Sequence, residues 1–386
     1  MAAGADLGAV ISSTGARPVM DRIGVHAMMR SIVAMVAIIV TLAGCGGGAG
    51  SPVAGVAATT GPPSSSASKV PVAPTASVEV PTPVPASPSA SRVIDPASPD
   101  TVIAAGACDI SGCRRLDVGL WHAVPFTPPI RCGLSGETCR LHFEIYAPTS
   151  GGPWPLIVLE PGGNVAPGEP GDYLDQMATA LAAKGAVVMV GQWRQSSQWA
   201  GRSPDSFADV ACAIGVARRI GPMFGANSER VVLAGHSKAT RPVAVIGLTP
   251  TAFTPAPGSC DATAGSLRPD AWADMAGPRD DIATAASDNR ELVAFFGGTR
   301  VANAAAWAAG DPFALAAQRS VAATDLPIVL VHGGADAGGA DARAFQAALM
   351  AGGHHSQLIE IPSADHFGTT IAKESIDAIL ALAAVP

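Results

Sequence analysis

Residues 230–240 read Arg-Val-Val-Leu-Ala-Gly-His-Ser-Lys-Ala-Thr, where an apolar, β-branched run gives way to small residues around one serine. The run predicts a buried strand, and the small residues predict a tight turn into a helix. Such a turn, a nucleophile elbow, holds a serine hydroxyl clear of its own backbone and needs small residues two positions before and after it. Gly235 and Ala239 hold those positions around Ser237. The five residues alone are a weak signal, because serine also caps many helices, but the preceding strand favours the elbow.

Predicted strands and helices alternate on both sides of this turn. Continuous apolar runs indicate buried parallel strands, and apolar residues at helical spacing indicate helices that pack on a sheet. The alternation predicts an α/β fold with a mostly parallel central sheet and helices on both faces. Besides the strand before the elbow, we expect strands at 154–159, 186–190, 271–275, 326–331 and 357–361, and helices at 173–184, 204–221, 291–318, 340–351 and 370–382. The polar–apolar alternation at 140–146 predicts a half-exposed antiparallel strand at the sheet edge.

The N-terminal region resembles a bacterial lipoprotein signal. Arg22 and Arg30 precede an apolar run at 32–42 that is short for a membrane span, and residues 42–45 read Leu-Ala-Gly-Cys. A basic segment, a short apolar segment and a small-residue cleavage site are the parts of such a signal. We therefore expect lipidation of Cys45 and a location on the extracytoplasmic side of a bacterial cell membrane. A single-pass anchor helix is the alternative. The long lead-in also allows translation to start at Met20, Met28 or Met29.

Composition divides the chain into three expected parts. Residues 1–44 form the signal peptide. Residues 45–104 are rich in Pro, Ala and Ser, with few charged or aromatic residues. Such a segment cannot bury enough apolar surface to fold, so we expect a disordered linker between the lipid anchor and the folded part. Residues 105–386 are expected to form one folded α/β domain.

The charge balance excludes one class of partner. The chain has 386 residues, a net charge of −7 and only 14% charged residues, with no cluster of Lys and Arg beyond short pairs. Nucleic-acid binding needs a basic face, so we expect no nucleic-acid partner.

The six cysteines after the linker form an even set, as expected where disulfides persist outside the cytoplasm. The sequence does not determine their pairing, and several free buried thiols are the alternative. None has the spacing to histidines that a metal site needs, so we expect no metal site and no cofactor. Proximity in the sequence favours the pairs Cys108–Cys113 and Cys132–Cys139, with Cys212 left for Cys260.

Three residues that could act together follow predicted parallel strands. Ser237, Asp336 and His366 each lie just past the carboxyl end of such a strand, and parallel strands bring these ends to one edge of a sheet. Their order, serine then acid then histidine, is that of an α/β-hydrolase triad. Asp341 is an alternative acid, because Asp336 could instead stabilise a turn.

The other histidines are weaker candidates for the base. His354 and His355 precede the last predicted strand, so they lie at its wrong end. His236 and His332 are more often packing or supporting residues in such positions.

From residue 141 to its C-terminus the chain resembles the α/β-hydrolase family of carboxylesterases, in particular the acetyl-esterase branch related to hormone-sensitive lipase. An α/β-hydrolase fold is what this resemblance implies. It rests on the segments PLIVLEPGGN (155–164), NSERVVLAGHS (227–237), FFGGT and DPFALA (within 295–316), LPIVLVHGGAD (326–336) and SADHFG (363–368).

The resemblance implies a serine hydrolase that cleaves carboxylic esters of small molecules or lipids. Ser237 would attack the ester carbonyl, His366 would move the proton and Asp336 would orient the imidazole. An oxyanion hole would use the backbone N–H of Lys238, with those of Gly163 and Asn164 from the glycine-rich turn.

Two departures from the family pattern surround the expected oxyanion hole. The family's HGGG turn is Pro-Gly-Gly-Asn at 161–164, and its GxSAGG elbow is Gly-His-Ser-Lys-Ala-Thr at 235–240. A catalytically weak member is therefore one alternative, and a non-catalytic cell-surface binding lipoprotein is another. A peptidase or thioesterase on the same fold is a third alternative, because the same acyl-transfer residues can act on amides and thioesters as well as esters.

Lys238 directly follows the expected nucleophile, which is an unusual place for a lysine. Its ammonium group either reaches solvent or a nearby carboxylate, or it lines the site and favours esters that carry an anionic group. Its backbone N–H is expected to serve the oxyanion hole in both cases.

Overall fold

The computed structural model describes residues 94–106, 116–133, 135–163, 172–195, 199–249, 253–262, 267–277, 289–318 and 326–384. These residues belong to one compact unit that spans Pro85–Pro386. The expected signal peptide, Cys45, most of the linker, the pair Cys108–Cys113 and Asn164 lie outside the described residues. No helix within the described ranges has the length and apolar character to cross a membrane.

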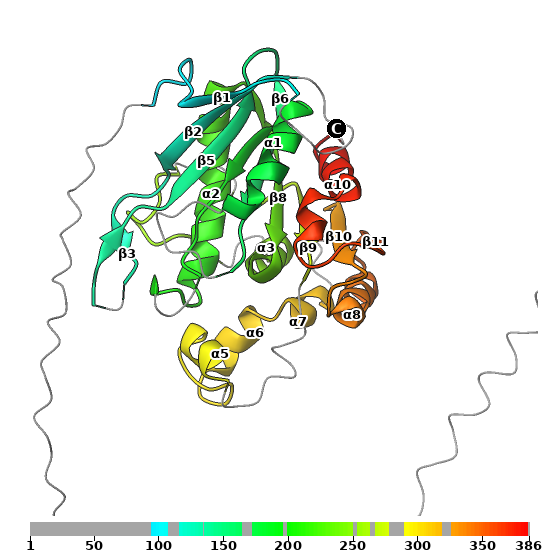
Figure 1. Ribbon diagram of the computed structural model, residues 1–386. Helices are drawn as coiled ribbons and strands as arrows, with labels where there is room; N and C mark the ends of the chain where they lie inside the picture. The colour runs from blue at the N-terminus through cyan, green and yellow to red at the C-terminus, as the bar shows by residue number, and fades with distance from the viewer. Residues whose placement is uncertain are drawn as a thin grey trace, which may run out of the picture. The chain divides into compact units, whose positions relative to one another are not determined.

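The described ranges contain a nine-stranded sheet with the order β1-β2-β5-β7-β6-β8-β9-β10-β11 (Figure 1). The strands from β7 to β11 pair in parallel, whereas β1, β2 and β5 pair antiparallel. This arrangement confirms the predicted α/β-hydrolase fold. The strands are β1 (Thr101–Ile103), β2 (Val118–Pro125), β5 (His142–Pro148), β6 (Trp154–Glu160), β7 (Val187–Val190), β8 (Ala226–His236), β9 (Ala271–Met275), β10 (Ile328–Gly333) and β11 (Ser356–Ile361). A separate hairpin joins β3 (Ile130–Arg131) to β4 (Thr138–Cys139).

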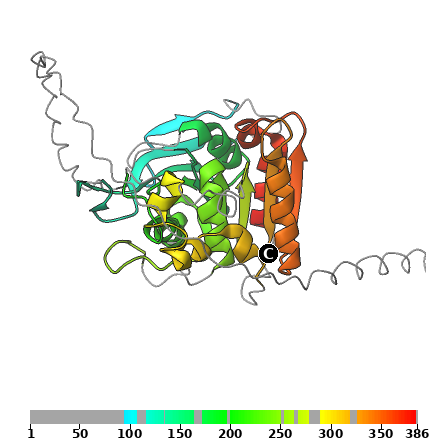
Figure 2. The ribbon, with the colours of Figure 1, turned by 90° about the horizontal axis from the view of Figure 1, so that it is seen from below.

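Helices cover both faces of the sheet, as predicted (Figures 1 and 2). The first face carries α1 (Asp175–Ala183), α9 (Gly368–Ile371) and α10 (Lys373–Ala384), and the second carries α2 (Asp205–Ile220), α3 (Thr240–Leu248) and α8 (Gly339–Ala351). Alternate residues of the strands point to the two faces, so the buried side chains form two apolar clusters.

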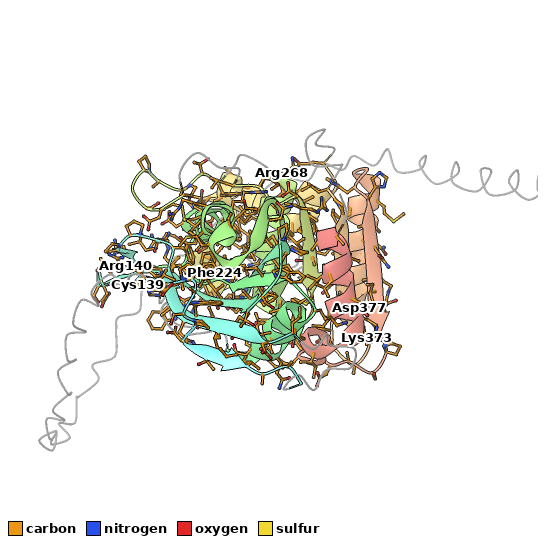
Figure 3. The ribbon with its side chains drawn as sticks, turned by 90° about the horizontal axis from the view of Figure 1, so that it is seen from above. Cys139, Arg140, Phe224, Arg268, Lys373 and Asp377 are labelled. Atoms are coloured by element: carbon orange, nitrogen blue, oxygen red, sulfur yellow. A yellow bond between two sulfur atoms is a disulfide. The ribbon has the colours of Figure 1, made fainter. Side chains whose placement is uncertain are left out.

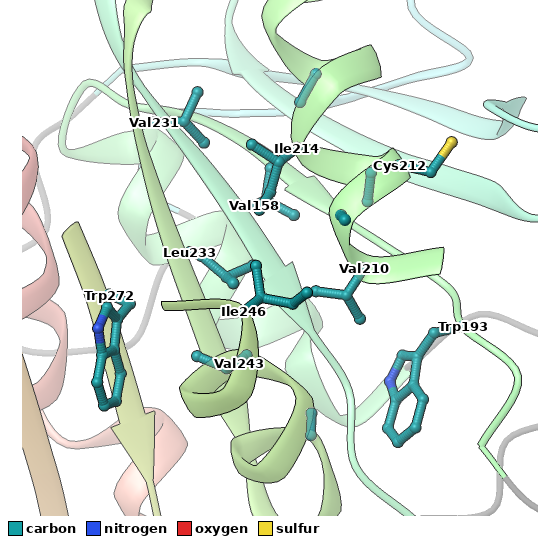
Figure 4. Packing of buried hydrophobic residues seen from close by; sticks show 14 of the residues in the cluster. Val158, Trp193, Val210, Cys212, Ile214, Val231, Leu233, Val243, Ile246 and Trp272 are labelled. Carbon is teal, nitrogen blue, oxygen red and sulfur yellow. The ribbon is translucent and has the colours of Figure 1, made fainter. Parts of the chain in front are cut away.

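The larger cluster lies between α2, α3 and the strands β6 and β8. Its side chains are almost completely buried, and aliphatic residues predominate because the chain has few aromatic residues. Figure 4 shows Val158, Val210, Ile214, Val231, Leu233, Val243 and Ile246 together in this layer. The packing fixes the strand that leads into Ser237 on a rigid support.

Three expectations from the sequence were wrong in detail. The strand expected at 140–146 is β5, which lies inside the sheet between β2 and β7 and is almost entirely buried. The helix expected at 291–318 consists of three short helices, α5 (Arg290–Phe295), α6 (Ala304–Ala309) and α7 (Pro312–Ala316). Gly297 and Gly298 have φ of +71° and +158° after α5, which ends that helix. The folded domain also begins before residue 105, because β1 pairs with β2.

Covalent and ionic links join distant parts of the domain. Cys132 is bonded to Cys139 next to the β3–β4 hairpin, and Cys212 on α2 is bonded to Cys260, as the sequence proximities predicted. On the other face, Asp377 of α10 pairs with Lys373 on the same helix and lies 2.7 Å from Nζ of Lys184 at the end of α1 (Figure 3 labels Lys373 and Asp377).

Candidate active site

Ser237, His366 and Asp336 lie in one hydrogen-bonded line. Nε2 of His366 is 2.8 Å from Oγ of Ser237, and its Nδ1 is 2.8 Å from Oδ2 of Asp336. The three residues come from the loops after β8, β11 and β10, at one edge of the sheet. The Asp336 side chain is 7% exposed and that of His366 is 27% exposed. An imidazole in this position can take a proton from the hydroxyl while the carboxylate stabilises the resulting cation.

The rival residues named in the sequence analysis lie elsewhere. Asp341 is in the first turn of α8, and the acid that reaches His366 is Asp336. His354 and His355 precede β11, at the end of that strand away from His366. His332 is a buried residue of β10.

The backbone at Ser237 has the sharp conformation of a nucleophile elbow. Its φ is +57°, a region that costs a non-glycine residue about 1–3 kcal/mol and is found where function requires it. A Cβ atom on Gly235 would lie 2.6 Å from Cγ2 of Val243 and 3.0 Å from O of Ala239. Close packing therefore requires glycine at 235.

The glycine-rich turn after β6 packs directly against the elbow. A Cβ on Gly162 would lie 2.8 Å from Cβ of Ser237 and 2.9 Å from N of Lys238, so only glycine fits there. Gly163 follows with φ of +83°. This contact places the glycine-rich turn beside the backbone of Ser237 and Lys238.

Buried side chains fix the backbone of this turn. The carbonyl oxygen of Pro161 accepts hydrogen bonds from Nε1 of Trp193 and Nε2 of Gln195, each at 3.0 Å. Arg194 lies between these two residues in the sequence, and both Nε and Nη2 of its guanidinium donate to the buried Asp209 of α2 at 2.8 Å. The loop after β7 is thus held on α2 and in turn holds the glycine-rich turn.

The buried His236 and the half-buried Tyr173 lie next to the triad. Nε2 of His236 lies 2.8 Å from the carbonyl oxygen of His366, and its Nδ1 lies 3.2 Å from the Tyr173 hydroxyl. That hydroxyl accepts a hydrogen bond from N of Gly162 at 2.5 Å. From the sequence, His236 was expected only to pack or support the site, and Tyr173 was not identified, although the chain has only two tyrosines.

Two buried carboxyl groups flank Gly235 in the sheet. Glu160 of β6 and Asp274 of β9 are both paired in register with Gly235 of β8. Both side chains are fully buried, and within the described ranges their carboxyl oxygens have no hydrogen-bond partner. Burial raises the pKa of each well above its usual range, and the nearby Asp209 raises the pKa of Glu160 further. Burial therefore favours the neutral, protonated form of both groups.

The described residues contain no cluster of three or more His, Cys, Asp or Glu side chains that could hold a metal ion.

Comparison with known proteins adds support for the fold. No protein-family model matches the sequence, and no curated protein sequence matches it. A bifunctional GH43-CE protein of Bacteroides eggerthii matches 63% of this chain with a TM-score of 0.52 and 20% identity. The match spans only 33% of that protein.

Two further solved structures have TM-scores just below 0.5. The native form of the thermophilic esterase Est2 from the Planctomycetes species Thermogutta terrifontis has a TM-score of 0.49 and 20% identity, over 67% of this chain and 90% of that one. A truncated carbohydrate esterase from gut microbiota has a TM-score of 0.47 and 16% identity, over 63% and 89% of the two chains.

Proposed function

We propose that this protein is a serine hydrolase that cleaves carboxylic esters through an acyl-enzyme intermediate. The observation that carries the proposal is the line from Asp336 through His366 to Ser237, with both hydrogen bonds at 2.8 Å. A serine becomes nucleophilic when an adjacent base can take its proton, and the elbow presents the hydroxyl at the open side of the turn.

In the proposed reaction, acylation of Ser237 is followed by hydrolysis of the acyl-enzyme. Oγ of Ser237 bonds to the ester carbonyl carbon while Nε2 of His366 takes the hydroxyl proton. The developing oxyanion is stabilised by backbone N–H groups at Gly163, Asn164 and Lys238. The bond to the alcohol oxygen then breaks, and His366 returns the proton to that oxygen. Water repeats the sequence on the acyl-enzyme, with His366 again as base, and regenerates Ser237.

The test combines a covalent probe with turnover. The purified chain should be labelled by a fluorophosphonate and should hydrolyse p-nitrophenyl acetate. Ser237→Ala should remove the label and lower kcat by roughly 10³-fold or more, because the nucleophile is lost. Ser259→Ala is the matched control, since that hydroxyl donates to Ala256 within its own turn. Activity of Ser237→Ala within about tenfold of wild type would contradict the triad.

The choice of esters over other acyl compounds rests on the resemblance to carboxylesterases. Matched p-nitroanilide and thioester substrates with the same acetyl group distinguish a peptidase or thioesterase from an esterase. A wild-type chain that takes no label and turns over none of them would instead indicate a binding protein.

We also propose that Cys45 is lipidated and that the linker tethers this domain to the extracytoplasmic side of a bacterial membrane. Metabolic labelling with a palmitate analogue should mark the wild-type chain but not Cys45→Ala, and the variant should leave the membrane fraction. A lipid-free wild-type N-terminus, or one at another residue, would contradict this.

A further inference from the structure

A hydrogen-bond bridge connects the glycine-rich turn to the loop of His366. It runs from N of Gly162 to the Tyr173 hydroxyl (2.5 Å), from that hydroxyl to Nδ1 of His236 (3.2 Å), and from Nε2 of His236 to O of His366 (2.8 Å). Residues 162, 236 and 366 lie in the loops or strand ends that hold the oxyanion donors, the nucleophile and the base. The bridge therefore touches all three parts of the proposed machinery.

The direction of every hydrogen bond in the bridge is fixed by its two ends. The amide of Gly162 can only donate, and the carbonyl of His366 can only accept. Nε2 of His236 must then carry the proton, which leaves Nδ1 as an acceptor for the Tyr173 hydroxyl. The hydroxyl accepts from Gly162 and donates to His236, so one neutral tautomer satisfies all four groups.

Burial keeps the bridge in this neutral state. His236 is completely buried, and its loss of solvation lowers its pKa to about 4. Burial also raises the pKa of the Tyr173 hydroxyl. Neither side chain changes charge near neutral pH, so the pattern of donors and acceptors is constant over the range in which His366 would act.

Ring packing reinforces the hydrogen bonds. The ring centroids of Tyr173 and His236 are 5.4 Å apart, and those of His236 and His366 are 4.8 Å apart. A positive charge on His236 at this distance would oppose the imidazolium that forms on His366 during acylation. The neutral form is therefore also the form that favours the transition state.

We propose that Tyr173 and His236 are positioning residues, which hold the glycine-rich turn and His366 in register with Ser237. This inference rests on the proposed hydrolase function, because it assigns the two residues to that same site. Tyr173 acts through the backbone of Gly162, next to the donor Gly163, and His236 acts through the backbone of His366. Small displacements of such groups lower the rate strongly, since a misplacement of about 1 Å can cost about 10²-fold.

The two tyrosines of the chain provide a matched test. Tyr146 is buried and Tyr173 is half-buried, and the Tyr146 hydroxyl donates to Oδ1 of Asp175 at 2.6 Å on the helix α1. Tyr173→Phe and Tyr146→Phe thus each remove one hydrogen-bonded hydroxyl, but only the first touches the bridge. Activity is measured with p-nitrophenyl acetate and expressed per site titrated with fluorophosphonate, which removes any contribution from unfolded chains.

Tyr173→Phe should lower kcat per titrated site by about tenfold or more with little change in KM, because the substrate still binds while the turn is misplaced. Tyr146→Phe should stay within twofold of wild type in kcat, whatever its melting temperature. Equal kcat values for the two variants would overturn the proposal while leaving the proposed function intact. An inactive, unlabelled wild type would overturn both.

Variants of His236 test the other end of the bridge and serve also if Tyr173→Phe does not fold. His236→Gln retains an amide N–H that can reach the carbonyl of His366, whereas His236→Leu retains only the bulk. The Gln variant should keep at least fivefold more kcat per titrated site than the Leu variant. If the two are equal, His236 contributes packing alone and the bridge has no positioning role.

Discussion

Nζ of Lys238 lies 2.5 Å from Oε1 of Glu291, which joins the residue after the proposed nucleophile to the helix α5. Their side chains are 25% and 64% exposed. The hydrogen bond and the charge of Lys238 lower the pKa of Glu291. Of the two hypotheses for the Lys238 side chain, the structure therefore favours pairing with a carboxylate, and Glu291 offsets its charge at the edge of the site.

Glu291→Gln should make the site more favourable to anionic esters. The substitution removes the negative charge of Glu291 beside the ammonium of Lys238, so kcat/KM for a carboxylate-bearing acetate should rise by about two- to fivefold relative to a neutral acetate. A two- to fivefold change corresponds to about 0.4–1 kcal/mol, which lies within the range typical of exposed charge pairs. High salt should reduce the difference, and Lys238→Ala in the same background should abolish it. A ratio that does not change in Glu291→Gln would show that Lys238 has no influence on substrate charge.

Asp336→Asn and Asp341→Asn should separate the two candidate acids. An amide at 336 can no longer hold the correct tautomer of His366 or stabilise its cation, so kcat should fall by roughly two to four orders of magnitude. Asp341→Asn changes only the first turn of α8 and should stay within about twofold. Steady-state turnover of p-nitrophenyl acetate measures both. A larger loss in Asp341→Asn would mean that Asp336 is not the acid.

Phe367→Ala should change selectivity for the alcohol part of the ester. The Phe367 ring is 59% exposed beside His366, with 5.3 Å between ring centroids. Because His366 returns the proton to the leaving alcohol, that part of the ester lies on its side of the site. Loss of the aromatic surface should lower kcat/KM for phenyl acetate by roughly three- to tenfold more than for methyl acetate.

The acyl series is the control for this prediction. Phenyl esters with acetyl and butyryl groups share the same alcohol, so Phe367→Ala should lower kcat/KM for both by the same factor. If the factor follows the acyl chain instead, Phe367 lies on the acyl side and the assignment is reversed.

Glu160 and Asp274 should make the domain less stable as the pH rises. In the unfolded chain both carboxyls lose their protons near pH 4, whereas burial raises the folded pKa of each well above that value. Between these limits the folded chain binds more protons, so the free energy of unfolding falls with increasing pH. Each group contributes up to about 1.4 kcal/mol per pH unit within its window.

Glu160→Gln and Asp274→Asn should each flatten this dependence, as measured by urea unfolding at pH 5, 7 and 9. Asp261→Asn is the control, because Asp261 is exposed and should leave the slope unchanged. A slope that both buried variants share with wild type would mean that the two carboxyls are charged in the folded domain.

Features that depend on which residues follow each strand could be predicted from the sequence. Ser237, Asp336 and His366 each follow a strand, and parallel strands bring such positions together at one edge. β2 was not predicted, because a bulge between Trp121 and Val124 interrupts its alternation, and β5 was therefore mistaken for an edge strand.

Contacts between residues that are far apart in the sequence could not be predicted from the local patterns. Tyr173 meets His236 across 63 residues, and nothing near either residue indicates its partner. Lys238 likewise meets Glu291 only because the short helix α5 lies at the site. Such pairs depend on how loops are placed over the sheet rather than on the pattern of any one element.

The helices α5, α6 and α7 lie between β9 and β10 in the sequence and contain none of the three triad residues (Figure 1). They nevertheless bring Glu291 to the nucleophile loop. Insertions or substitutions in 289–318 can therefore alter which compounds reach Ser237 while the distances within the triad are preserved by the sheet. Under the proposed function, this segment is where descendants of the gene would acquire new substrates without rebuilding the triad.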